Sequence, residues 1–204
     1  TVFFLIERAD VPSEWKTSLT ISALVTGIAF WHYLYMRSMW ISTGSSPTVY
    51  RYVDWLITVP LQIVEFYFIL RAVTKVRSTL FWQLLISSLV MLVGGYLGEA
   101  NYIDRTAGFV IGMLGWAGVI YLIFVGEAAK ASSNSENLAG QKAFKSLRII
   151  VFAGWSIYPA GYLFAIDSNI ELVNIIYNFA DLVNKTTFGL VIWAAAKSDL
   201  AKRT

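Results

Sequence analysis

The chain has 204 residues, of which 57% are hydrophobic and only 14% are charged, and its net charge is +3 at pH 7. A soluble domain is usually about 25% charged, so this chain lacks the polar surface that would cover a water-soluble globule. It contains no cysteine, which excludes disulfides and thiolate metal sites. The composition therefore predicts a membrane protein.

Six apolar runs are long enough to span a bilayer, since a helix needs about 20 residues to cross the hydrocarbon. They are predicted at about 17–36, 48–70, 80–97, 107–125, 147–166 and 172–196. A seventh run, 1–6, is too short to span, and we interpret it as the tail of a spanning helix that begins outside this chain. The links are short, including that at about 165–171, and no internal repeat is visible. The sequence predicts an all-α fold with a single domain over residues 1–204, a seven-transmembrane-helix bundle whose first helix is only partly present.

Positive charge gathers at one end of this predicted bundle. With the fragment counted as the first helix, the links after helices 1, 3 and 5 and the C-terminus carry 12 of the 16 Lys and Arg residues: Arg8, Lys16, Arg71, Lys75, Arg77, Lys130, Lys142, Lys145, Arg148, Lys197, Lys202 and Arg203. The opposite side carries Arg37 and Arg105, while Arg51 and Lys185 lie within helices. The positive-inside rule then predicts a cytoplasmic C-terminus and an N-terminus outside.

Three polar residues share one face of the predicted helix at 48–70. Asp54, Thr58 and Glu65 are spaced i, i+4 and i+11, which at about 100° per residue places them on one side. Asp54 and Glu65 are then roughly 16 Å apart along the axis, about half the hydrocarbon thickness. Two carboxylates at two depths can pass protons along a path. This helix runs inward, so Glu65 lies on the cytoplasmic side of Asp54.

The last predicted helix carries Asp181 and Lys185 at i and i+4, again on one face. A lysine at bilayer depth is costly and by default marks a functional site. A cationic Lys185 derivative that faces Asp54 and Asp181 would offset the cost of burying the carboxylates, and Arg51 would add compensating charge. A structural ion pair between Lys185 and Asp181 is the plainer alternative, but it leaves Asp54, Glu65 and Arg51 unexplained.

Aromatic residues are dense, with 8 Trp, 11 Tyr and 13 Phe. Most fit the core or the interfacial belts of a membrane protein. Trp55, Trp155 and Tyr158 lie on helices that would face the lysine, and they could wall an elongated apolar ligand. Pro60 and Pro159 would kink their helices and leave room for that ligand or a hinge.

His32, the only histidine, lies between aromatic neighbours in the middle of the predicted helix at 17–36. A lone histidine in such a place is more often held by hydrogen bonds than catalytic, although its titration range suits modulation of a nearby carboxylate. The sequence shows no Gly-rich phosphate loop, no Cys/His metal cluster and no Ser-His-Asp set. Its basic residues form a rim rather than a nucleic-acid patch. We therefore expect no metal and no nucleic-acid partner.

Three motifs resemble those of the microbial rhodopsins, and specifically the proteorhodopsins. They are Arg-Tyr-Val-Asp-Trp-Leu-Ile-Thr-Val-Pro-Leu at 51–61, Trp-Ser-Ile-Tyr-Pro at 155–159 and Asp-Leu-Val-Asn-Lys at 181–185. The stretches 15–19 and 26–33 are also similar to the proteorhodopsins rather than to archaeal members. The resemblance extends over nearly the whole chain.

The resemblance implies a light-driven outward proton pump, a transporter rather than an enzyme, in a bacterial cell membrane. All-trans retinal would be bound to Lys185 as a protonated Schiff base. Asp54 would be the proton acceptor and main counterion, Asp181 the second counterion, and Glu65 the cytoplasmic proton donor. His32 would pair with Asp54 and make pumping depend on pH.

The same resemblance implies the retinal pocket and the assembly. The residues that it places around retinal, besides Lys185, are Trp55, Thr58, Gln62, Met91, Trp155, Tyr158, Pro159 and Asp181. Gln62 corresponds to the colour-tuning position, where glutamine resembles blue-absorbing members and leucine resembles green-absorbing ones. Arg51 and Thr58 would belong to the proton-transfer site. Members of the family usually form pentameric or hexameric rings, which implies a homo-oligomer in the lipid bilayer.

A slow light sensor that signals to a partner is the main alternative function, because blue-absorbing relatives can have slow photocycles. An acidic donor at Glu65 favours a pump, since rapid reprotonation matters most to a pump, and no partner motif is visible. A light-gated channel would need a continuous polar pore, whereas the helix at 48–70 is apolar between its few polar residues. A scaffold without a chromophore leaves Lys185 unexplained.

Overall fold

The computed structural model describes residues 1–164 and 170–202, and the regular structure of these residues is helical. The helices are α1 (Val2–Glu7), α2 (Lys16–Thr43), α3 (Thr48–Val73), α4 (Ser78–Glu99), α5 (Arg105–Phe124), α6 (Glu127–Ser133), α7 (Leu138–Ile149), α8 (Ile157–Phe164) and α9 (Ile170–Leu200). Two 3-10 turns, η1 (Arg8–Asp10) and η2 (Ser13–Trp15), lead into α2, and a π-helical segment, η3 (Ile150–Gly154), joins α7 to α8. Most of the short link predicted at about 165–171 lies outside the described residues.

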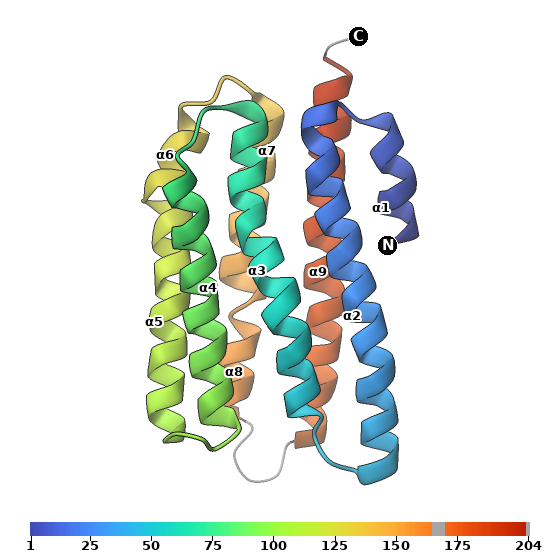
Figure 1. Ribbon diagram of the computed structural model, residues 1–204, viewed down its shortest axis with the longest axis vertical. Coiled ribbons are helices and arrows are strands. Elements are labelled where there is room, and N and C mark those ends of the chain that lie inside the picture. The colour runs from blue at the N-terminus through green and yellow to red at the C-terminus, as the bar shows by residue number, and fades with distance from the viewer. Residues whose placement is uncertain (165–169, 203–204) are drawn as a thin grey trace.

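The helices stand side by side as one upright bundle (Figure 1). α6 extends the column of α5, and α7, η3 and α8 form another column, so the described residues make seven columns. The six-residue helix α1 packs against α2 and α9 along one half of the bundle only (Figure 1). Phe4 of α1 fits against Gly189 of α9, where a Cβ would lie 2.4 Å from the Phe4 ring. The predicted all-α seven-helix bundle is confirmed.

Five stretches are long and apolar enough to cross a membrane: Ser13–Thr43, Thr48–Val73, Ser78–Glu99, Arg105–Ser133 and Leu138–Phe164. The sixth predicted span, 172–196, forms most of α9. This helix has 31 residues, and Asp181, Asn184 and Lys185 place polar side chains within the predicted span. These three side chains are buried inside the bundle rather than turned to its outer face.

α3 runs through the centre of the bundle. Of the 18 consecutive residues that make up its most apolar stretch, 56% are buried. The corresponding share in the other four candidate spans is 28–39%. The outer helices instead expose large apolar side chains, such as Phe30 on α2 and Leu114 on α5. An outward apolar surface suits lipid, because the hydrocarbon is no more polar than these side chains. The polar residues of α3 are therefore enclosed by protein.

α4 and α5 pack backbone against backbone. A Cβ on Gly98 would lie 2.9 Å from the Cα of Gly108, and a Cβ on Gly115 would lie 2.3 Å from the backbone nitrogen of Met91. Glycines allow this close approach between membrane helices. The contact fixes the backbone of Met91 tightly against α5.

Pro60 and Pro159, the two prolines inside predicted spans, differ in their surroundings. α3 remains helical through Pro60. The sixth column is interrupted before Pro159, where η3 and a turn at Trp155 and Ser156 separate α7 from α8. A π-segment disturbs the regular backbone hydrogen bonding of a helix and is frequent at functional sites. The interruption of this column therefore begins in the π-segment, ahead of the proline.

Carbonyl groups of the π-segment accept hydrogen bonds from other helices. Trp116 Nε1 of α5 donates to the Val151 carbonyl at 3.3 Å, and Asn184 Nδ2 of α9 donates to the Gly154 carbonyl at 3.1 Å. Gly154 is needed there, since a Cβ would lie 2.3 Å from Asn184 Oδ1. These bonds tie the irregular column to both of its neighbours.

Candidate functional site

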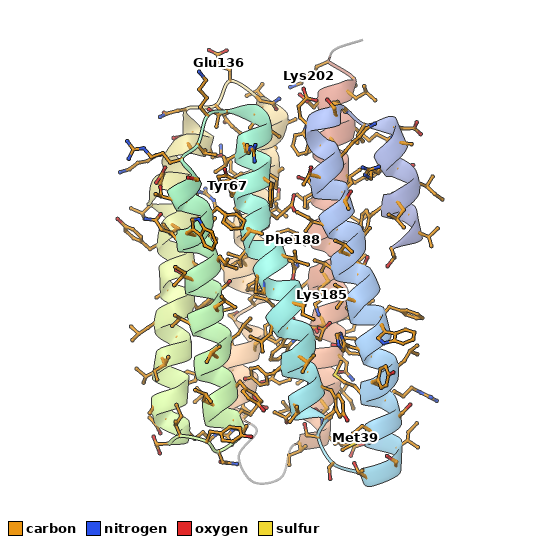
Figure 2. All side chains as sticks on the ribbon, in the orientation of Figure 1. Met39, Tyr67, Glu136, Lys185, Phe188 and Lys202 are labelled. Atoms are coloured by element: carbon orange, nitrogen blue, oxygen red, sulfur yellow. The ribbon has the colours of Figure 1, made fainter. Side chains whose placement is uncertain are left out.

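Lys185 is buried about halfway along the bundle, on α9 (Figure 2). Its Nζ donates to Asp54 Oδ2 at 2.5 Å and to Asp181 Oδ2 at 2.9 Å. Both carboxylates are buried, with exposed fractions of 0% for Asp54 and 2% for Asp181. The structure thus brings together the lysine and the two aspartates that the sequence placed on two separate helices. One buried cation lies between two buried carboxylates.

Asp181 is the more completely hydrogen-bonded of the two carboxylates. Its Oδ2 accepts from the Tyr33 hydroxyl at 2.7 Å and from Trp55 Nε1 at 3.0 Å, in addition to Lys185. Its Oδ1 accepts from the Tyr158 hydroxyl at 2.6 Å. Hydrogen bonds to a charged acceptor are short and strong. These donors, from four helical segments, hold Asp181 in one position.

Asp54 has fewer partners. The Thr58 hydroxyl, one turn along α3, donates to the Asp54 backbone carbonyl at 3.0 Å and lies 3.5 Å from its Oδ2. His32 Nδ1 lies 3.4 Å from Asp54 Oδ1, and this oxygen has no hydrogen-bond donor among the described residues. The two carboxylates therefore differ: Asp181 is saturated with donors, whereas Asp54 keeps an open oxygen.

Glu65 lies on α3 toward the end of the bundle that carries the C-terminus. It is fully buried, and neither carboxylate oxygen has a hydrogen-bond donor among the described residues. Ser18 of α2, also fully buried, is the polar side chain beside it. Ile63 and Val64, the two residues before Glu65 on α3, are buried and apolar. Glu65 is thus a second buried acidic site, separate from the Lys185 cluster.

Arg51 lies one turn from Asp54 in the opposite direction and is 1% exposed. Its Nη2 donates to Asn174 Oδ1 at 2.6 Å, and its guanidinium carbon lies 5.1 Å from the centre of the Tyr177 ring. Both partners are neutral. Among the described residues, Arg51 is therefore held by neutral partners and makes no direct ion pair.

A cavity opens beside Lys185 between α3, α4, α5, α8 and α9, and its wall is mostly apolar and aromatic. It is lined by eight of the residues that the sequence assigned to a ligand pocket: Trp55, Gln62, Met91, Trp155, Tyr158, Pro159, Asp181 and Lys185. Thr58 is not part of this wall, because its hydroxyl turns back to the Asp54 carbonyl. The cavity can take an apolar ligand that reaches Lys185.

Aromatic contacts stiffen the wall near Lys185. The Trp55 ring packs edge-on against Tyr158 at 5.1 Å and against Tyr177 at 5.6 Å between ring centres. The Gln62 side chain also lines the cavity, and its Nε2 has no hydrogen-bond acceptor among the described residues. A polar amide therefore lies against any ligand that fills this apolar space.

The sequence interpretation gave no role to several residues of the site, which include Tyr33, Asn174, Tyr177 and Asn184. Tyr33 donates to Asp181, and Asn184 Nδ2 lies 3.3 Å from the Tyr158 hydroxyl. Tyr33 and Asn184 stand within the family-like stretches 26–33 and 181–185, next to His32 and Lys185, but no role was assigned to them. Neighbours on a helix point about 100° apart, so adjacency alone does not place both side chains in one site.

The whole chain is similar to proteins of one family. Residues 1–199 match the family of bacteriorhodopsin-like proteins. The green-light absorbing proteorhodopsin of Gamma-proteobacterium EBAC31A08 is 53% identical over 200 residues, which cover 96% of this chain and 80% of that protein. The blue-light absorbing proteorhodopsin of Gamma-proteobacterium Hot 75m4 is 53% identical over 201 residues, with the same coverage of 96% and 80%.

Solved structures share the fold. The blue light-absorbing proteorhodopsin from Med12 superposes with a TM-score of 0.84 at 53% identity, covering 97% of this chain and 91% of that chain. Xanthorhodopsin, a light-driven ion pump with a dual chromophore, superposes with a TM-score of 0.82 at 25% identity, covering 99% and 88%. On the family match and these identities, the chain is a membrane protein of the bacteriorhodopsin-like family and belongs, within it, to the proteorhodopsins.

Proposed function

We propose that this protein is a light-driven outward proton pump, a transporter rather than an enzyme, that carries retinal on Lys185. The observation that carries the proposal is the buried Lys185 amine, held between Asp54 and Asp181 at the wall of an aromatic cavity. A lysine, a proton acceptor and an apolar pocket are the parts that such a pump requires. The similarity to proteorhodopsins and to a light-driven ion pump supports the same function.

The residues of the cavity fit retinal. Lys185 offers the amine for a Schiff base, and Trp55, Trp155 and Tyr158 offer flat aromatic surfaces to a long apolar chain. When bound, retinal would absorb light and supply an isomerisation that changes the surroundings of the Lys185 nitrogen. Asp181, fixed by its hydroxyl and indole donors, would remain a counter-charge for that nitrogen.

Asp54 is the acceptor that the geometry favours for the proton of the Lys185 nitrogen. Its Oδ2 is 2.5 Å from Nζ, and its other oxygen has no donor among the described residues. Thr58 and His32 flank the Asp54 carboxyl, and each can hold it in place. Glu65, buried on the other side of the cluster, would return a proton to the Lys185 nitrogen.

The direction of transport follows from the position of Glu65. It lies toward the end of α3 at which the basic links and the C-terminus gather, and the positive-inside rule makes that end cytoplasmic. Protons taken up through Glu65 and passed on to Asp54 move outward. The proposal therefore includes a bacterial inner membrane, with the N-terminus outside.

Illumination tests the function directly. External pH is measured during illumination of cells that express the protein with retinal, with and without a protonophore. We expect acidification that the protonophore abolishes. An unchanged pH from a coloured and correctly inserted protein would overturn the pump and favour a light sensor.

A Glu65→Gln variant should retain its colour and slow the return of the proton. Glutamine has nearly the same size but cannot donate a proton. General acid–base groups typically contribute 10²- to 10⁴-fold, so we expect reprotonation slowed on the order of a hundredfold. Flash-induced absorbance changes measure this rate. Glu136→Gln, an exposed carboxylate at the same end, is the control and should behave like the wild type. Unchanged kinetics in Glu65→Gln would rule out Glu65 as donor.

We also propose that the pigment absorbs blue light. The Gln62 amide lies in the cavity wall, where it can stabilise the ground-state charge distribution of a bound polyene more than the excited one. Gln62→Leu should therefore shift the absorption maximum to longer wavelength. Gln83→Leu makes the same chemical change on an exposed position of α4 and should leave the spectrum in place. A stationary maximum in Gln62→Leu would remove this assignment.

A homo-oligomer in the bilayer, as a pentamer or hexamer, is part of the proposal. The outer face of α2 exposes Phe30 and Trp31, at 65% and 59%, and this apolar surface can pack against lipid or a second copy. The mass of the detergent-solubilised protein measures the copy number. A monomer in mild detergent and in lipid nanodiscs would contradict it.

A further inference from the structure

A buried polar cluster closes the end of the bundle that carries the C-terminus. Asp199, in the last turn of α9, is 5% exposed. Its Oδ2 accepts from Trp15 Nε1 at 3.0 Å, and its Oδ1 accepts from Asn137 Nδ2 at 2.7 Å. Trp15, fully buried, precedes α2, and Asn137 precedes α7. We call these three residues the Asp199 clasp, since they join three segments that are distant in sequence.

The clasp also controls the start of α7. The Asn137 side chain caps this helix, because its Oδ1 accepts from the Gly140 backbone N–H at 2.8 Å. The same amide group donates to Asp199 through its nitrogen. Ser135 in the same link donates its hydroxyl to the Val73 carbonyl at the end of α3, at 3.4 Å. The first turn of α7 is therefore held by one side chain to the end of α9.

The clasp lies beyond Glu65 on the way to the cytoplasmic surface. α3 and α9 run in the same direction (Figure 1), and Asp54 of α3 contacts Lys185 of α9. Glu65 comes 11 residues after Asp54 on α3, which is about 16 Å along the helix axis. Asp199 comes 14 residues after Lys185 on α9, which is about 21 Å along that axis. Asp199 is thus about one helical turn nearer the surface than Glu65.

Trp15 connects the clasp to the surroundings of Glu65. Trp15 and Ser18 are three residues apart at the start of α2, so they lie on one face, and Ser18 is the polar neighbour of Glu65. The turn η2, which ends at Trp15, packs against α3. The indole that Asp199 holds therefore lies about one helical turn from the side chain that neighbours Glu65.

Apolar side chains fill the space under the clasp. Ile192 lies midway between Lys185 and Asp199 on the inner face of α9, and Phe66 packs against Phe144 of α7 at 5.3 Å between ring centres. All three apolar side chains are no more than 1% exposed. A proton needs water or polar groups to cross such a layer, because apolar packing offers it no partner. Proton uptake by Glu65 therefore requires this end to open.

We propose that Asp199 is a positioning residue for proton uptake: its bonds to Trp15 and Asn137 keep the cytoplasmic end closed, and their breaking admits water to Glu65. The inference rests on the proposed pump and on Glu65 as its donor. None of the three clasp residues lines the cavity at Lys185. Weakening the clasp should thus speed uptake without changing the pigment or the transfer to Asp54.

Trp15→Phe is the sharpest test, because it removes the indole N–H and keeps an aromatic ring. The full chain with retinal is placed in lipid nanodiscs, and a pH-indicator dye follows proton uptake after a laser flash. We expect uptake about tenfold faster, as for the loss of one hydrogen bond to a charged acceptor, with an unchanged absorption maximum and an unchanged first transfer. Asp199→Asn should act in the same direction, and the double variant should add little, because both changes remove the same bond.

Trp193→Phe is the matched control. Trp193 Nε1 donates to Glu7 Oε2 at 2.8 Å, an indole–carboxylate bond near the same end of α9 but only partly buried. This variant should keep the wild-type uptake rate. The proposed role of Asp199 would be overturned if proton uptake in Trp15→Phe were unchanged or slower than in the wild type. It would also be overturned if Trp193→Phe sped up proton uptake as much as Trp15→Phe does. A wild type that takes up no protons in light would instead overturn the proposed pump, so the two failures are distinguishable.

Discussion

Lys185→Ala should form no pigment at all. Lys185 is the lysine in the cavity wall among the described residues, and without its amine retinal has no covalent partner there. The change also leaves Asp54 and Asp181 buried around a missing cation. An uncompensated buried charge costs about 3–5 kcal/mol, so the variant should also be less stable by that order. Visible absorbance after addition of retinal measures the first effect, and thermal unfolding measures the second.

Lys185→Arg separates the two effects. A guanidinium keeps a cation near both carboxylates but has no amine that can form the covalent bond to retinal. We expect no pigment from this variant but higher stability than Lys185→Ala. Lys142→Ala, at an exposed position, should keep both pigment and stability. Covalent pigment in Lys185→Ala would contradict the assignment, whereas a loss of stability without any pigment in the wild type would favour a purely structural ion pair.

Asp54→Asn should abolish transport and leave the protein coloured. Asparagine keeps the shape of the side chain and can still contact Lys185 and Thr58, but its amide does not accept the proton. Asp181 stays beside Lys185, at 2.9 Å, as the remaining counter-charge, so the pigment should form. Light-driven pH change per coloured molecule is the measurement. We expect it to fall to the level of wild type treated with protonophore.

Asp104→Asn is the matched control for this change. Asp104 is an exposed carboxylate that caps α5 by accepting from the Ala107 N–H at 2.9 Å. Asparagine caps helices about as well as aspartate, so transport should be unaffected. Transport by Asp54→Asn at the wild-type rate would place the acceptor on another group, with Asp181 as the next candidate.

The chain alone determined the features that depend on local periodicity and on hydropathy. Apolar runs of spanning length predict membrane helices whatever their neighbours, because the bilayer leaves backbone groups no other partners. The i, i+4 spacing places Asp54 with Thr58, and Asp181 with Lys185, on common faces because each helix has 3.6 residues per turn. The resemblance to the family also directed attention to eight of the residues that line the cavity.

The features that depend on contacts between helices were decided only by the tertiary structure. The sequence could not show that Asp181 receives donors from Tyr33, Trp55 and Tyr158 while one oxygen of Asp54 receives none. Nor could it show that the interruption of the sixth column begins in a π-segment before Pro159.

The Asp199 clasp is the clearest case, since Trp15 and Asp199 are 184 residues apart and Asn137 and Asp199 are 62 apart. Periodicity assigns a residue to a face of its own helix. Which faces meet, and at what height, is set by the packing of side chains from all of the helices at once. Local periodicity and hydropathy made the helices and the central lysine predictable, whereas the difference between the two aspartates and the bonds of Asp199 depend on that packing.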